Sequence, residues 1–154
     1  PIPIGFGVKA FNHLLGESPI SFYGREDLAA RYSENFPDSL DGAPVLLPMT
    51  GSAQRRSLEG WFEEIGVTPE IVAEFDDSAL LKAFGEAGAG IFPAPIAIEN
   101  QLEYTYHVRL IGAAGPLKET YYAISPERVL RQTAVRHITD RARQQLLQLK
   151  QVIR

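Results

Sequence analysis

Short apolar runs alternate with amphipathic stretches through the middle of the chain. Residues 45–47, Val-Leu-Leu, form a continuous apolar run between two prolines, which is typical of a buried strand in a parallel sheet. Residues 71–75 predict a second strand, and Ile91-Phe92, before the sequence Pro-Ala-Pro, predict a third. Each of the first two runs is followed by residues with helical spacing, so strands and helices are expected in turn.

The first predicted helix follows the run at residues 45–47. Its apolar positions, which recur at i, i+3, i+4 and i+7, are Leu58, Trp61, Phe62 and Ile65. Ser52 is the expected N-cap, because its hydroxyl can accept a hydrogen bond from a free backbone N–H in the first turn. Gly66 is placed to end the helix. The helix is therefore predicted between these two residues.

The second predicted helix follows residues 71–75. The capping sequence 76–78, Asp-Asp-Ser, precedes it, and the glycine-rich run 85–90 closes it. Its apolar face consists of Leu80, Leu81 and Phe84. Strands that alternate with helices in this way form βαβ units with a parallel sheet, so the predicted fold class is α/β.

The flanking segments have weaker patterns. Residues 20–23 alternate between apolar and polar and predict a strand, whereas residues 8–15 fit either a strand or a short helix. Residues 25–43 contain glycine, proline and aspartate and are expected to be mostly loop, with one helical turn at residues 27–32.

The C-terminal third predicts two strands and a long helix. The strands are expected at residues 108–111 and 119–125, with a turn at the sequence 112–116, Gly-Ala-Ala-Gly-Pro, between them. The helix has apolar positions every three or four residues, and these are Val135, Ile138, Ala142, Leu146, Leu149 and Ile153. We expect the opposite, charged face to be solvated and the apolar face to need a partner, which favours homo-association.

The composition is that of an ordinary globular protein: of 154 residues, 45% are hydrophobic and 22% are charged. The formal net charge of −4 provides no positive field for nucleic acid or for an anionic membrane, so DNA contact is expected only through a domain outside this chain. The absence of cysteine excludes thiolate chemistry and favours a cytoplasmic protein. No apolar stretch is long enough for a membrane span, and a start at Pro-Ile-Pro-Ile suggests a fragment.

The sequence contains no motif for catalysis or metal binding. The histidines lie far apart and lack zincin spacing; they are His13, His107 and His137. The glycine-rich run 85–90 follows a helix instead of opening one, so it is not a phosphate-binding loop. No cofactor is therefore expected. An α/β enzyme would need an acid/base pair near residues 50–52, where Glu74, Asp76 and Asp77 are the candidates.

A binding site is more consistent with these residues, because ligands of open α/β sheets lie at the carboxyl ends of strands and at helix N-termini. The preferred site, with two hydroxyls and several backbone donors, consists of Thr50, Gly51 and Ser52. Asp76 and Asp77 occupy the corresponding place after the second strand, either as a helix cap or as ligands of a cation. Pro93 and Ala94 follow the third strand and are expected to form an apolar wall.

The residues at 85–95, Gly-Glu-Ala-Gly-Ala-Gly-Ile-Phe-Pro-Ala-Pro, resemble the aaGxGixxlP signature of LysR-type transcriptional regulators. Residues 44–52 resemble the strand of that family that leads to a Ser/Thr-bearing helix N-terminus. Two further blocks, residues 8–17 and 74–84, look like the NhaR-type, sodium-responsive activators within the family. The resemblance extends over nearly the whole chain.

This resemblance implies an effector-binding domain with two lobes, similar to those of type 2 periplasmic binding proteins. The second lobe would be complete at residues 22–122, and residues 1–21 and 123–154 would form part of the first lobe. The winged helix-turn-helix of the family has no counterpart in the chain. The family places its ligand between the lobes, which corresponds here to residues 50–52.

The function implied by the resemblance is effector sensing and homo-oligomerisation in a transcriptional activator, with no enzymatic activity. Sodium is the effector that the subgroup suggests, in regulation of a sodium/proton antiport response. A solute-binding protein of the same fold and an α/β enzyme fragment are the alternatives. The first of these predicts an export signal, and this chain displays none.

Overall fold

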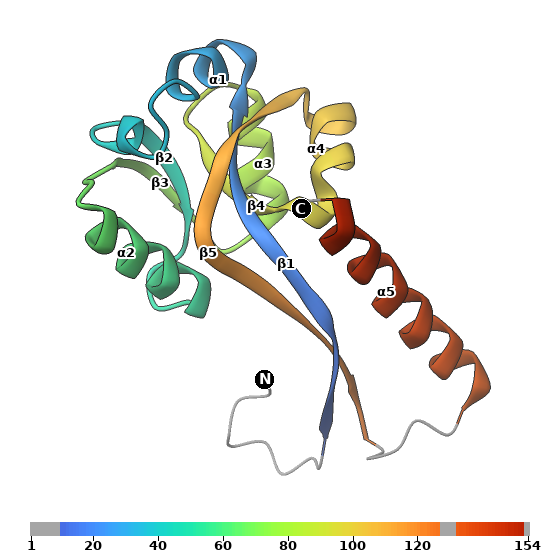
Figure 1. Ribbon diagram of the computed structural model, residues 1–154. Coiled ribbons are helices and arrows are strands. Elements are labelled where there is room, and N and C mark those ends of the chain that lie inside the picture. Colours follow the sequence, from blue (N-terminus) through green and yellow to red (C-terminus); the bar gives the residue numbers. More distant parts are fainter. Residues whose placement is uncertain (1–9, 127–131, 153–154) are drawn as a thin grey trace. The chain divides into compact units, whose positions relative to one another are not determined.

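The computed structural model describes residues 10–126 and 132–152, and the chain divides into two compact units. The larger unit is Pro19–Lys118, and the smaller one combines Pro1–Ser18 with Glu119–Arg154. Figure 1 shows the helices and strands in chain order. The resemblance predicts that the chain passes between the lobes after residues 21 and 122. Both positions lie a few residues further along the chain than the boundaries of these two units.

The larger unit contains the predicted βαβ unit. Strand β2 (Pro44–Pro48) leads into helix α2 (Ala53–Ile65), which returns the chain to strand β3 (Glu70–Phe75). The two strands pair in parallel, with an irregularity after Val45. Helix α3 (Ser78–Glu86) follows directly (Figure 1). All four elements confirm the predictions made from hydrophobic spacing.

Strand β4 (Phe92–Pro95) corrects the expectation of a wholly parallel sheet. Ile91 forms a parallel bridge with Val45, but the strand after it pairs antiparallel with β1 (Phe11–Arg25). Strand β1 is the middle strand of a sheet with the order β4-β1-β5. The prediction failed because β1 comes from a distant part of the sequence, and the local pattern at Ile91-Phe92 does not report its partner.

Strand β5 (Val108–Ser125) is one continuous strand, so the turn predicted at residues 112–116 is wrong. The glycines there make room for aromatic rings. A Cβ at Gly112 would overlap the ring of Phe36, and a Cβ at Gly115 would lie 2.7 Å from the indole Nε1 of Trp61. Glycine in a strand often marks such a close approach, which the sequence pattern does not distinguish from a turn.

Three local elements differ in extent from the predictions. Strand β1 begins at Phe11, so the described part of residues 8–15 is a strand and not a short helix. Helix α1 (Glu26–Tyr32) is longer than the single turn that was predicted. A short 3-10 helix (Asp38–Leu40) lies in the predicted loop, and another (Ile96–Ile98) precedes α4 (Glu99–Tyr106), which was not predicted. Helix α4 buries only Leu102, so it lacks the apolar stripe that reveals a helix in a sequence.

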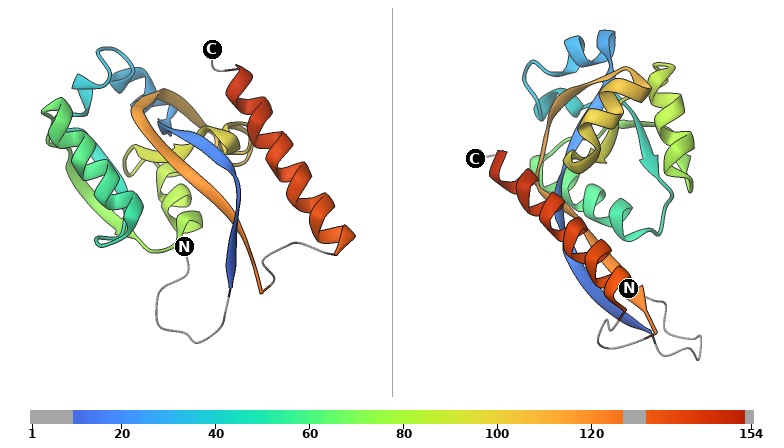
Figure 2. Two further views of the ribbon diagram at one scale, coloured as in Figure 1. Left: turned by 60° about the horizontal axis from the view of Figure 1, so that its bottom comes forward. Right: turned by 90° about the vertical axis from the view of Figure 1, so that its right-hand side faces the viewer.

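Two apolar clusters lie on opposite faces of the strands in the larger unit. Successive residues of β2 alternate between them: Val45 and Leu47 belong to the first cluster, and Leu46 belongs to the second. Helix α2 contributes Leu58, Trp61 and Phe62 to the first cluster, whereas α3 and α4 contribute Leu81 and Leu102 to the second. Figure 2 shows these helices around the strands from two further sides.

In the smaller unit, helix α5 (Thr133–Val152) packs against the first half of β1. The Nε atom of Arg143 donates a hydrogen bond of 2.9 Å to the carbonyl oxygen of Leu14. The side chain of Leu146 lies against Gly16, where a Cβ would come within 3.1 Å of it. In the described part of the chain, no helix is long and apolar enough to span a membrane.

The buried face of α5 differs from the predicted apolar stripe. Ile138 is 71% exposed, whereas the adjacent Thr139 is buried. The hydroxyl of Thr139 donates to the carbonyl of Val135 at 2.9 Å, and this satisfied hydrogen bond makes its burial possible. Val135 and Ile138, both on the predicted stripe, are thus exposed in this structure. The side chains of Leu149 and Ile153 lie outside the described residues.

Candidate functional site

The loop between β2 and α2 carries the residues that the sequence favoured. Ser52 is the N-cap of α2, as predicted, and its Oγ accepts a hydrogen bond of 3.1 Å from the backbone N–H of Arg55. Gly51 has φ +91°, in the left-handed region, with open space around its Cα. This conformation strains residues with a side chain, so the loop requires glycine there. Thr50 is exposed.

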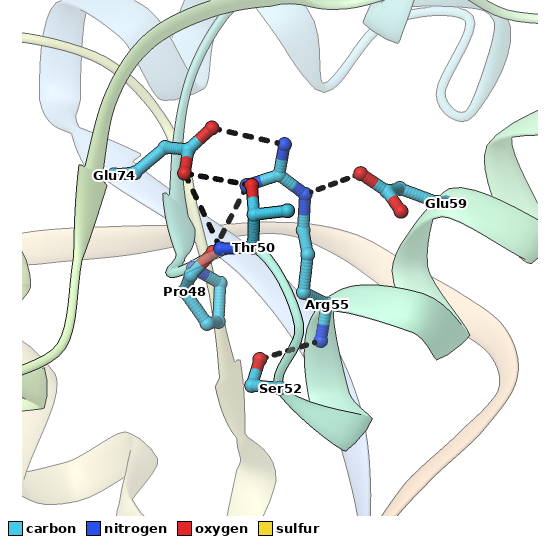
Figure 3. A network of polar contacts seen from close by, with 6 residues as sticks. All are labelled: Pro48, Thr50, Ser52, Arg55, Glu59 and Glu74. Atoms are coloured by element: carbon cyan, nitrogen blue, oxygen red, sulfur yellow. Dashed lines mark hydrogen bonds and ion pairs between the residues drawn. The ribbon is translucent and has the colours of Figure 1, made fainter.

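A buried arginine beside the loop bonds to the residues that hold it (Figure 3). The side chain of Arg55 is only 4% exposed, and three of its nitrogens have acceptors. Its Nη1 donates to the carbonyl of Pro48 at 3.0 Å and its Nε to Glu59 at 2.7 Å. Its Nη2 donates to Glu74 Oε1 at 3.2 Å. Arg55 thereby joins the ends of β2 and β3 to the first turn of α2.

Glu74 connects this arginine to the exposed residue of the loop (Figure 3). Its Oε2 accepts one hydrogen bond of 2.9 Å from the Thr50 hydroxyl and a second of 3.3 Å from the Thr50 backbone N–H. These bonds, together with the positive charge of Arg55, lower the pKa of Glu74 from its usual value. Glu74 is therefore ionised at neutral pH, and it acts as a hydrogen-bond acceptor in the free chain.

Sequence reasoning found the loop but not the pair of charges that holds it. Among the sequence-based candidates, Glu74 appears only as the acid that an enzyme would need, and Arg55 is absent. The signal for Arg55 was its position three residues before Leu58, because it continues the buried stripe of α2 by one turn. A charged residue on a buried helix face is normally paired, so its position pointed to carboxylates nearby.

Asp76 and Asp77 lie in the connection between β3 and α3, and both are exposed. Asp77 caps α3: its Oδ1 accepts a hydrogen bond of 2.7 Å from the N–H of Ala79. The capping role is the one that the geometry supports. Across residues 10–126 and 132–152, no group of three or more His, Cys, Asp or Glu residues is placed to hold a metal ion.

Pro93 and Ala94 lie within β4, where they pair with Phe22 and Ser21 of β1. Both are buried, and Ala94 belongs to the second apolar cluster. The polar network around Thr50 does not include them. The contacts of the polar loop therefore do not bear on the predicted role of Pro93 and Ala94 as the wall of a ligand cleft.

His13 and His107 have hydrogen-bond partners other than the residues of this network. Where described, His13 is hydrogen-bonded to Ser125 at 2.9 Å, in the smaller unit, and His107 to Glu86 at 3.0 Å. Neither of these hydrogen bonds involves Glu74, whose carboxylate accepts hydrogen bonds from Thr50 and Arg55. The loop is thus an exposed segment whose polar atoms are held by hydrogen bonds.

The chain is an α/β domain of two units, with a polar loop at the carboxyl end of a parallel strand, where open α/β sheets bind ligands. A family model described as the LysR substrate binding domain matches residues 11–147, and the chain belongs to this family. The expected fold class and the resemblance to LysR-type regulators are confirmed.

The sequence relatives are transcriptional activators, not enzymes. The chain is 34% identical over 130 residues to the transcriptional activator protein NhaR of Escherichia coli K12 and equally to that of Shigella flexneri. The match covers 84% of this chain but 42% of either relative. The chain thus spans less than half the length of the curated relatives it matches.

Solved structures of LysR effector domains share the fold. The regulatory domain of HypT from Salmonella typhimurium, in its apo form, has a TM-score of 0.64 at 16% identity and covers 94% of this chain and 68% of its own. The effector binding domain of QuiR in complex with shikimate has a TM-score of 0.59 at 16% identity, covering 97% and 69%. These likenesses are similarities of fold.

Proposed function

We propose that this chain is the effector-sensing and oligomerising region of a LysR-type transcriptional activator, with its effector contacts at Thr50, Gly51 and Ser52. The main support is the loop itself, which is exposed although a buried arginine fixes its backbone. A loop held in this way presents its polar atoms in one geometry, so a ligand binds with little ordering cost. Pro93 and Ala94 would supply the apolar wall of the same cleft.

The proposal assigns the two lobes as the family resemblance suggests, with residues 22–122 as the second lobe and residues 1–21 and 123–154 within the first. DNA binding would belong to a part of the regulator outside this chain, and the regulator would act in the cytoplasm. The similarity to NhaR supports sodium as the effector and regulation of a sodium/proton antiport response. Asp76 and Asp77 would be candidate ligands of a sodium ion, and Glu74 is the carboxylate in contact with the loop.

The test of the site is the variant Thr50→Val in the full-length regulator. It removes the hydroxyl at nearly constant volume, and the backbone N–H that bonds Glu74 is kept. We expect the concentration of sodium chloride needed for half-maximal reporter activation to rise, since the variant removes the hydroxyl proposed to contact the effector and its hydrogen bond to Glu74. Total ionic strength is held constant with choline chloride.

Thr68→Val is the matched control, because Thr68 is also exposed and lies at the other end of α2. It should leave the response unchanged. DNA binding without effector, measured by fluorescence anisotropy, should be the same for both variants and the wild type. A wild-type response of Thr50→Val would refute the site.

Homo-oligomerisation is supported by exposed apolar residues on β3 and α3. Four large side chains there are 45–49% exposed, and they are Ile71, Val72, Leu80 and Phe84. Because exposed apolar side chains occur on both elements, these elements are the candidates for a protein interface. In the proposed assembly these two elements contact a second copy of the chain.

The double variant Val72→Glu/Leu80→Glu should convert the oligomer into a monomer, because it places two charges in the proposed interface. Light scattering after size-exclusion chromatography measures the mass. Leu110→Glu is the control, since Leu110 is similarly exposed, at 44%, but lies on β5. Equal masses for the wild type and the double variant would contradict the interface.

A further inference from the structure

Met49 carries the one sulfur atom of the chain, which has a single methionine and no cysteine. It lies between Pro48, the last residue of β2, and Thr50 of the proposed effector loop. Met49 is 49% exposed, so small molecules in solution reach its side chain. Oxidation to the sulfoxide is a common reaction of methionine. The chain therefore offers an oxidant one accessible sulfur atom, and that atom belongs to the residue before Thr50.

Hydrogen bonds hold the backbone of Met49 on both sides. Its N–H donates a bond of 2.8 Å to the carbonyl of Phe75, at the end of β3, and its carbonyl accepts one of 3.3 Å from the N–H of Ser52. Thr50, the next residue, is bonded to Glu74 through its N–H and its hydroxyl. A chemical change in the side chain of Met49 therefore takes place beside Thr50, on a backbone that is held in position.

Oxidation at this position is compatible with the folded chain. Methionine sulfoxide is polar, and it disrupts a protein where the side chain is packed in a core. Met49 belongs to neither of the two apolar clusters, and half of its surface already meets solvent. The sulfoxide oxygen can therefore lie in water. The expected effect is a local change in the chemistry beside the loop, without unfolding.

We propose that Met49 is an oxidation site through which hydrogen peroxide changes the effector response. This inference rests on the proposed function, because Met49 adjoins the residues assigned there to the effector. The sulfur lone pair attacks one oxygen of the peroxide, so that an S–O bond forms and the O–O bond breaks. After proton transfer the other oxygen leaves as water. The sulfur loses two electrons and the peroxide gains them, and methionine sulfoxide reductases reverse the change.

The product supplies a new oxygen atom beside the loop. The sulfur of a thioether is soft and a weak acceptor, whereas the oxygen of a sulfoxide carries a partial negative charge. Sodium, like calcium and magnesium, is a hard cation, and hard cations take oxygen ligands. Oxidation of Met49 should therefore make the loop more favourable for sodium, so that the oxidised regulator responds at a lower sodium concentration.

The test compares the full-length regulator before and after treatment with hydrogen peroxide, which is then removed. Transcription in vitro gives the half-maximal concentration of sodium chloride, with ionic strength held constant by choline chloride. This concentration should fall on treatment, and peptide mass spectrometry should find one added oxygen atom on Met49. Methionine sulfoxide reductase should reverse both changes.

Two variants assign the effect to this sulfur atom. Met49→Leu keeps an apolar side chain of similar volume, so peroxide should not change its half-maximal sodium concentration. Sulfur atoms elsewhere in the regulator are oxidised in this variant too, and their effects are thereby separated. Met49→Leu/Leu110→Met moves the thioether to β5, where Leu110 is similarly exposed, at 44%. Peroxide should oxidise position 110 there without changing the sodium response.

The inference is overturned if Met49 stays unmodified, or if the treated wild type needs as much sodium as the untreated protein or more. It is also overturned if Met49→Leu is as sensitive to peroxide as the wild type. An untreated regulator without any sodium response would instead refute the proposed effector, and a normal response of Thr50→Val would refute the proposed contacts. These failures appear in samples that have not met peroxide, so they are distinguishable from failure of the oxidation site.

Discussion

Trp61→Ala should lower the free energy of unfolding by about 3–5 kcal/mol, as expected for loss of a buried aromatic side chain. Trp61 is 4% exposed and lies among three phenylalanine rings, with centroid distances of 6.1 Å to Phe22, 6.4 Å to Phe36 and 5.8 Å to Phe62. The cavity left by the indole would be lined by these rigid rings, which limits how far the site can collapse. Its burial confirms the position predicted from helical spacing.

Urea unfolding followed by far-ultraviolet circular dichroism measures this change. Tyr104→Ala is the control, because it also removes an aromatic side chain from a helix, but Tyr104 is 88% exposed. The control should change stability by less than about 0.5 kcal/mol, as is usual for surface positions. A Trp61→Ala chain as stable as the control would contradict the role of the indole in the first apolar cluster.

Helix α2 shows which features the sequence predicts well. Its start, its apolar face and its end were each marked by residues close in sequence: Ser52 caps it, and Gly66 ends it with φ +72°. Hydrogen bonding at the cap and the conformational freedom of glycine act over a few residues. Such local causes can be identified without knowing the rest of the fold.

The parts that the sequence did not predict depend on distant partners. Gly112 and Gly115 belong to a continuous strand because Phe36 and Trp61 need the space, and these rings come from segments far earlier in the chain. The antiparallel pairing of β4 with β1 has the same origin. The sequence shows where a glycine is, but only the fold shows whether that glycine forms a turn or lies in a strand against a neighbouring side chain.

The candidate site divides in the same way. Thr50 and Ser52 were found from their place after a strand and before a helix, which is a local relation. The contact of Glu74 with Thr50 spans 24 positions and depends on the parallel pairing of β2 with β3. The residue types in the loop therefore do not reveal that the Thr50 hydroxyl already donates to Glu74.

Gly85→Ala should destabilise the chain by about 2 kcal/mol, although alanine is the better helix former. Gly85 is buried in α3, and a Cβ there would overlap the ring of Phe92. Phe92 is fully buried in the second apolar cluster and lies beside Tyr23 at a centroid distance of 6.3 Å, so its ring has little freedom to move. Overpacking a core costs about 1–3 kcal/mol, and an overlap with a fixed ring belongs at the upper end.

Helix propensity opposes this cost, because replacing glycine with alanine in a helix contributes about 1 kcal/mol of stability. Gly60→Ala isolates that contribution: Gly60 lies in α2, and a Cβ there would have nothing within 4 Å. Gly60→Ala should therefore raise the urea midpoint, whereas Gly85→Ala should lower it. A higher midpoint for both variants would contradict this prediction. It would mean that the ring of Phe92 can move to accept a Cβ at position 85, so that the close contact between α3 and β4 does not limit the packing of the second cluster.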